Sequence, residues 1–173
     1  MARLFLAVWP DAPARASLAA IASEVARRCG GRAVPAAKLH LTLAFLGEAD
    51  PARVPPGALA QVAAQSAPFE LALDRLGAFA RAGVALAGFT EAAPALLHLQ
   101  AGVESRLREA GFDLEDRPYA PHLTLARHVR TRIAAEAIGP VAWRVASFAL
   151  VESERGSGAY REVARWPLAG EKT

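Results

Sequence analysis

The chain has 173 residues, of which 53% are hydrophobic and 21% charged, and its net charge is +3. That length and composition fit one folded domain, or two small lobes sharing a core, and exclude a disordered chain. The mild positive charge favours anionic partners but excludes the basic excess of a protein that coats nucleic acid. A single cysteine, Cys29, excludes a disulfide framework, and no apolar run reaches the about 18 residues of a membrane span. We therefore expect a cytoplasmic protein with no membrane partner.

Hydrophobic periodicity and turn residues predict strands interleaved with helices. The predicted strands cover residues 3–9, 38–46, 69–77, 83–89, 121–128, 141–152 and 158–167. The predicted helices run from an Asp11 cap to about Cys29, over 51–66, over 93–110, and over a short piece at 131–137. Because these elements follow no regular βαβ rhythm, we expect an α+β fold with a mostly antiparallel sheet.

One pentapeptide, His-Leu-Thr-Leu-Ala, occurs twice, at His40–Ala44 and at His122–Ala126. The chain has four histidines, so half of them lie in this duplicated motif. The duplication predicts two similar halves related by an approximate internal two-fold axis.

Strand geometry predicts which side chains of the motif act together. Alternate residues of a strand face opposite sides, so the leucines of each copy face the core. His40 and Thr42 then share the other face about 7 Å apart, as do His122 and Thr124. The same alternation places Phe45 on the core face, with the leucines of the first copy.

Two imidazoles on opposite walls of a groove suit paired general acid and base catalysis, because imidazole titrates near neutral pH. One histidine could activate water against a phosphodiester while the other protonates the departing alkoxide, and the threonine hydroxyls could bind the non-bridging oxygens. This scheme needs no metal, and a zinc site lacks a third ligand at a recognisable spacing. A structural histidine–threonine pair, duplicated with its gene, is the alternative without chemistry.

The two motif histidines, 82 residues apart, resemble those of the two-histidine phosphoesterase superfamily. The closest resemblance is to the RNA 2′,3′-cyclic phosphodiesterases, also called 2′-5′ RNA ligases. It extends to Arg3–Pro10, to Arg117–Arg127 and to the closing hairpin around Tyr160. The resemblance implies that residues 1–173 form a single bilobal α+β domain. Its two pseudo-symmetric lobes would have helices packed outside and a central active-site cleft between them.

The same resemblance implies metal-independent hydrolysis of a terminal 2′,3′-cyclic phosphate on RNA to a 2′-phosphomonoester, and a reverse reaction that joins ends through a 2′-5′ bond. It implies His40 as the proton donor and His122 as the proton acceptor, with Thr42 and Thr124 binding the phosphate. No cofactor is expected. The expected partners are RNA ends or nucleotides bearing a 2′,3′-cyclic phosphate, bound by a monomer.

Three further residues are candidates for substrate binding. Arg127 belongs to the second motif and suits a phosphate, but alternation places it on the face opposite His122 unless the strand ends or bulges before it. Lys38 shares the His40 face by alternation and could meet the RNA backbone. Tyr119 could stack on a base.

Base recognition is where this sequence departs from the family. Family members often carry tryptophan at the positions of Ala33 and Leu86, and aromatic rings stack on unpaired bases. Trp9 is a candidate replacement; Phe5 and Phe45 are too, although core packing suits those two better. Two alternative functions stay open: a phosphodiesterase acting on a small cyclic nucleotide or ADP-ribose cyclic phosphate, and an RNA- or nucleotide-binding module without turnover.

Overall fold

The computed structural model describes residues 2–169, in which nine strands form one sheet and three α-helices pack against it. The strands are β1 (Ala2–Val8), β2 (Arg32–Ala33), β3 (Leu41–Ala49), β4 (Phe69–Phe79), β5 (Val84–Gly88), β6 (Leu123–Arg127), β7 (Glu136–Val145), β8 (Ser147–Ser153) and β9 (Tyr160–Pro167). The helices are α1 (Ala12–Cys29), α2 (Pro56–Ala64) and α3 (Pro94–Glu109). The pairings along this sheet are antiparallel, which confirms the expected α+β class.

The order of the strands repeats the duplication seen in the sequence. The sheet runs β7-β4-β5-β6-β3-β1-β8-β9, with β2 added to β6. The two strands that directly follow the motif histidines, β3 and β6, are therefore neighbours at the centre, and each begins a half of four strands. We call β3 and β6 the motif strands.

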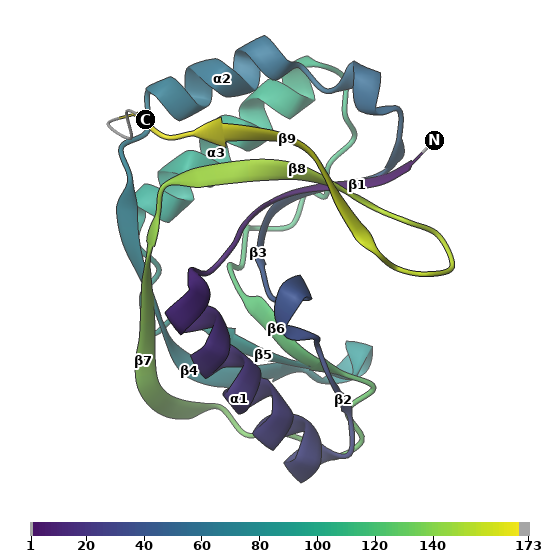
Figure 1. Ribbon diagram of the computed structural model, residues 1–173, viewed down its shortest axis with the longest axis vertical. Coiled ribbons are helices and arrows are strands. Elements are labelled where there is room, and N and C mark those ends of the chain that lie inside the picture. The colour runs from purple at the N-terminus through teal and green to yellow at the C-terminus, as the bar shows by residue number, and fades with distance from the viewer. Residues whose placement is uncertain (1, 170–173) are drawn as a thin grey trace.

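Helices cover each half of the sheet on one side (Figure 1). Helix α1 packs on β6 and β7, whereas α3 packs on β3, and α2 packs on α3 and β9. The α1 boundaries match the sequence prediction: the Asp11 carboxylate accepts a hydrogen bond from the Ala14 N–H at 2.9 Å, and Gly30 ends the helix in the left-handed conformation. In the part of the chain that the structure describes, no helix is long and apolar enough to cross a membrane.

Two predicted helices differ from the structure. Residues 131–135 are irregular and Glu136 begins β7, because pairing with β4 overrides the helical preference of this alanine-containing segment. The helix predicted over 51–66 is broken into a 3₁₀ turn at Pro51–Arg53 and helix α2, since consecutive prolines at 55 and 56 supply no N–H and oppose continuous helix before them.

The strand predicted over 141–152 is two strands. The break lies at Ala146, and the two pieces belong to different halves of the sheet: β7 pairs with β4, whereas β8 pairs with β1 and β9. The segment Glu136–Ser153 thus passes from one half of the sheet to the other. The predicted hairpin of the last two strands is confirmed, with its turn at residues 155–157.

Candidate active site

The two copies of the pentapeptide meet at the centre of the sheet. Leu41 of β3 lies directly opposite Leu123 of β6 in an antiparallel pair. Extending this register by one residue on each side places each motif histidine opposite the threonine of the other copy. The leucines are buried in the core, and the four polar side chains are half-buried on the other face of the sheet. We call this the site face, and its central residues are His40, Thr42, His122 and Thr124.

Both imidazoles are held by the same local hydrogen bond. The Nδ1 atom of His40 lies 2.7 Å from the carbonyl oxygen of Lys38, and Nδ1 of His122 lies 2.8 Å from that of Ala120. A carbonyl oxygen only accepts, so Nδ1 carries the proton in each ring. The Nε2 atom of each histidine is thereby left available to take or give a proton.

Aromatic rings enclose His40. Its ring stacks on Phe5 with centroids 4.9 Å apart and on Trp9 at 5.4 Å, and meets the edge of Tyr160 at 5.6 Å. Phe5 is buried, but in a small cluster on the site face rather than in the main core. Phe5 of β1 and Trp9, which directly follows this strand, therefore contact the first histidine.

This enclosure changes the acidity of the first histidine. Burial lowers the pKa of His40, and the hydrogen bond to the Lys38 carbonyl opposes that effect only in part. The positive charges of Arg127 and His122 lower the pKa of His40 further. In the free protein, its neutral form is accordingly favoured, and a bound anion would favour the protonated form.

The second histidine has a more open environment. His122 meets one ring, that of Phe79, in an edge-to-face contact with centroids 4.9 Å apart. Phe79 is 44% exposed and ends β4. It could not be assigned to the site from the sequence, because the strand was predicted to stop at residue 77 and the β4–β5 neighbourhood of His122 depends on sheet order.

A bulge occurs at the same place in both motif strands. The register leaves Leu43 without a partner on β1, and likewise leaves Leu125 without a partner on β5. Each bulge interrupts strict alternation, so the residue two positions later is exposed instead of buried: Phe45 in β3 and Arg127 in β6. The expectation that Phe45 faces the core is therefore wrong. The charge of Arg127 acts on His40, which places its guanidinium near the site.

The side chain of Lys38 contacts the closing hairpin of the chain. It ends a 3₁₀ turn before β3, so the predicted strand over 38–46 begins too early. Its ammonium donates a hydrogen bond to the carbonyl oxygen of Gly158 at 2.6 Å and lies 5.1 Å from the ring centroid of Tyr160. These contacts connect the segment before His40 to the β8–β9 turn, and they engage the ammonium that was expected to meet RNA.

Tyr119 also braces the site. Its hydroxyl donates a hydrogen bond to the carbonyl oxygen of Thr42 at 2.8 Å, and its ring packs against the main core. Burial raises the pKa of this phenol, so the hydroxyl keeps its proton. In this geometry Tyr119 connects the two motifs through a hydrogen bond, and its ring does not offer an open surface for stacking on a base.

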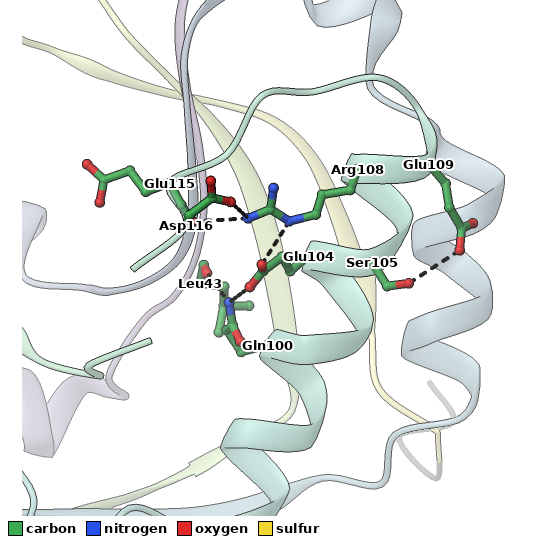
Figure 2. Close-up of polar contacts among 8 residues, drawn as sticks. All are labelled: Leu43, Gln100, Glu104, Ser105, Arg108, Glu109, Glu115 and Asp116. Atoms are coloured by element: carbon green, nitrogen blue, oxygen red, sulfur yellow. Dashed lines mark hydrogen bonds and ion pairs between the residues drawn. The ribbon is translucent and has the colours of Figure 1, made fainter. Parts of the chain in front are cut away.

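Helix α3 braces the same region from behind the sheet (Figure 2). The amide of buried Gln100 donates hydrogen bonds to the carbonyl of Leu43, at 3.4 Å, and to Glu104, at 2.8 Å. Glu104 accepts from Arg108, whose guanidinium also donates to the carbonyl of Glu115 at 3.0 Å. The β3 bulge and the segment leading to the second motif are thus attached to one helix.

The remaining residues considered from the sequence lie around the edges of the site. Ala33 pairs with Ala126, and Leu86 is half-buried opposite Thr124. Leu86 consequently presents an apolar side chain beside a motif threonine, where the family often has tryptophan. Within residues 2–169, no group of three or more His, Cys, Asp or Glu side chains is arranged to hold a metal ion.

Comparison with known proteins identifies the family. The sequence model of the 2′-5′ RNA ligase superfamily matches residues 9–157. The chain belongs to this superfamily. It is 38% identical over 166 residues to the RNA 2′,3′-cyclic phosphodiesterase of Thermus thermophilus, covering 88% of this chain and 82% of that protein. It is 32% identical over 141 residues to the protein of the same name from Escherichia coli, with 80% of each covered.

Solved structures of superfamily members share the fold. The crystal structure of Escherichia coli LigT complexed with 3′-AMP superposes with a TM-score of 0.84 at 30% sequence identity. The match covers 96% of this chain and 98% of that one. The superfamily fold therefore extends over nearly the whole chain, including both motif strands.

Proposed function

We propose that this chain is an RNA 2′,3′-cyclic phosphodiesterase that hydrolyses a terminal cyclic phosphate to a 2′-phosphomonoester. The observation that carries the proposal is the pair of motif histidines at the starts of two neighbouring strands, each with Nδ1 bonded to a carbonyl and Nε2 available. Similarity over 80% or more of each chain to proteins with this activity in their names supports the same substrate. The site belongs to a single bilobal domain spanning residues 1–173.

In the proposed reaction, Nε2 of His122 takes a proton from water as the water oxygen attacks phosphorus. The bond between phosphorus and the ribose 3′ oxygen breaks, and Nε2 of His40 gives its proton to that oxygen. The open surroundings of His122 suit access by water, whereas the rings around His40 suit contact with a nucleoside. Each turnover leaves the two histidines with exchanged protonation, which solvent then restores.

The assignment of His40 as the proton donor requires it to be protonated when substrate is bound. Its pKa is lowered in the free protein by burial and, further, by neighbouring positive charge, including that of Arg127. A phosphate anion between the histidines opposes both effects, because it compensates that charge and interacts favourably with imidazolium. Substrate binding thus raises the pKa of His40 and favours the protonated ring that donates the proton.

The threonines and Arg127 supply charge stabilisation in this proposal. The hydroxyls of Thr42 and Thr124 donate hydrogen bonds to the non-bridging phosphate oxygens, where negative charge concentrates. Arg127, turned out by the β6 bulge, adds a positive charge near the same phosphate. In the reverse direction a 5′-hydroxyl replaces water and the histidines exchange roles, which forms a 2′-5′ bond. We propose that the protein acts as a monomer, since both motifs lie in one chain. We also propose that it acts in the cytoplasm.

The experiment is incubation with an oligonucleotide that ends in a 2′,3′-cyclic phosphate, in the presence of EDTA, followed by identification of the product. A terminal 2′-phosphate supports the proposal. A 3′-phosphate contradicts the assigned chemistry. Turnover of only small cyclic nucleotides or ADP-ribose cyclic phosphate, or binding without turnover, supports the alternatives.

A further inference from the structure

A groove of about 520 Å³ lies next to the site face and has no role in the chemistry proposed above. It is formed by the start of β1, the second half of β3 and the β8–β9 turn. Its volume falls within the range of about 300–1,000 Å³ that is common for sites that enclose small molecules. Its lining includes Arg3, Phe45, Gly47, Glu48, Ser153 and Arg155. We call it the Arg3–Phe45 groove.

The groove continues the site face. The β3 bulge turns Phe45 away from the core, where strict alternation would have placed it. On β1, Arg3 and Phe5 are two residues apart and share a face, and Phe5 stacks on His40. Phe45 lies five residues beyond His40, which is roughly 15 Å along a bulged strand. A ligand could therefore extend from the histidines into the groove.

The chemistry of the groove suits a flat, polar-edged ring. Phe45 is 49% exposed, and the guanidinium of Arg3 lies 5.3 Å from its ring centroid. Among residues 2–169, Arg3 makes no ion pair, whereas the positive charge of Arg155 is compensated by Glu48. Aromatic rings and guanidinium planes both stack on unpaired bases, and guanidinium also donates to base edges. The paired charges favour a nucleobase over a run of phosphates.

The proposed reaction determines which nucleotide reaches this groove. His40 protonates an oxygen of the terminal ribose, so that nucleoside lies on the His40 side of the phosphate, towards β1 and β8. The groove lies on the same side and directly beyond the rings that enclose His40, because Phe45 is the β3 partner of Phe5, whose ring stacks on His40, and Arg3 lies two residues further along β1. The nucleotide joined to the 5′ oxygen of the terminal nucleoside is the next group that can enter.

We infer that the Arg3–Phe45 groove binds the nucleobase of the nucleotide preceding the cyclic-phosphate end. This inference rests on the proposed function and narrows its substrate class. The protein prefers an RNA chain of two or more nucleotides to a cyclic mononucleotide, because Phe45 and Arg3 supply a second stacking site.

The test compares kcat/KM for two substrates: cytidine 2′,3′-cyclic phosphate and the cytidine dinucleotide that ends in a 2′,3′-cyclic phosphate. We expect the dinucleotide to be favoured by about 5-fold to 100-fold, as for one stacked base. Phe45→Leu, which keeps an apolar side chain, removes most of this advantage, and Phe45→Trp retains it. Leu97→Ala on the outer surface of α3 is the matched control, since Leu97 is similarly exposed at 41%, and it leaves the ratio unchanged.

Equal kcat/KM for both substrates in the parent chain overturns the inference, as does an unchanged ratio in Phe45→Leu. If neither substrate is turned over, the proposed function fails instead. The groove is then tested by binding alone, with the 2′-phosphorylated dinucleotide and mononucleotide titrated calorimetrically into the His122→Ala variant. Tighter binding of the dinucleotide that depends on Phe45 supports the groove, and equal affinity overturns it.

Discussion

Tyr119 is the residue whose role differs most between sequence and structure, and Tyr119→Phe tests that role directly. The substitution removes one oxygen and keeps the ring that packs against the core. The carbonyl oxygen of Thr42 then loses the donor that lies 2.8 Å from it. We therefore expect the variant to fold, but with a less stable connection between the two motifs.

The size of the effect follows from that single hydrogen bond. A net hydrogen bond contributes about 0.5–1.5 kcal/mol, and a buried carbonyl left without a partner costs about 1–3 kcal/mol. Since water can reach the half-buried Thr42 in part, we expect a loss of about 1–2 kcal/mol in the free energy of unfolding. For a chain of this length, each kcal/mol lowers Tm by about 3 °C.

The assay is urea denaturation of the parent, of Tyr119→Phe and of Tyr160→Phe, the chain's other tyrosine. In the described part of the chain the Tyr160 hydroxyl has no hydrogen-bond partner, so its removal leaves the midpoint nearly unchanged. Tyr119→Phe lowers the midpoint with an unchanged m value. It also lowers kcat by up to about 10²-fold, because small displacements of catalytic groups are costly. Equal midpoints for Tyr119→Phe and the parent would refute a bracing role for the hydroxyl.

The remaining predictions concern the central residues of the site face, to which the proposed function assigns catalytic roles. His40→Ala and His122→Ala each lower kcat by about 10²–10⁴-fold on the cyclic-phosphate oligonucleotide, and near-full activity in both would end the two-histidine proposal. Thr42→Val lowers kcat by about 10-fold to 10³-fold through the loss of one donor, and wild-type kcat would contradict a phosphate-binding role. Stability should also respond to pH through His40. Its pKa is below the ordinary value in the folded chain, so the unfolded chain binds this proton more tightly. The stability associated with a neutral His40 is fully present above about pH 6.5, and it is lost as the pH falls below that value. As the pH is lowered from 8 to 5, the urea midpoint should therefore fall less steeply in His40→Phe than in the parent.

The sequence by itself determined the fold class and the four polar residues that share the site face. These depend on local features: the period-2 pattern of each pentapeptide, the duplication, and caps such as Asp11 and Gly30, which set the ends of α1. The i−2 carbonyl that orients each imidazole is also local. A repeat of this kind carries its polar and apolar faces wherever it folds, so both histidines could be predicted to share a face with their threonines.

Only the tertiary structure decided how the surroundings of these four residues are arranged. The bulges at Leu43 and Leu125 arise from register with β1 and β5, so no local pattern reveals that Phe45 and Arg127 turn outward. The same is true of contacts between distant segments, such as Lys38 with a carbonyl 120 residues away. Alternation is a property of one strand, whereas register and neighbours are properties of the whole sheet. For that reason the chain's sequence specified the four polar residues of the site face, and its sheet order determined which aromatic and basic side chains surround them.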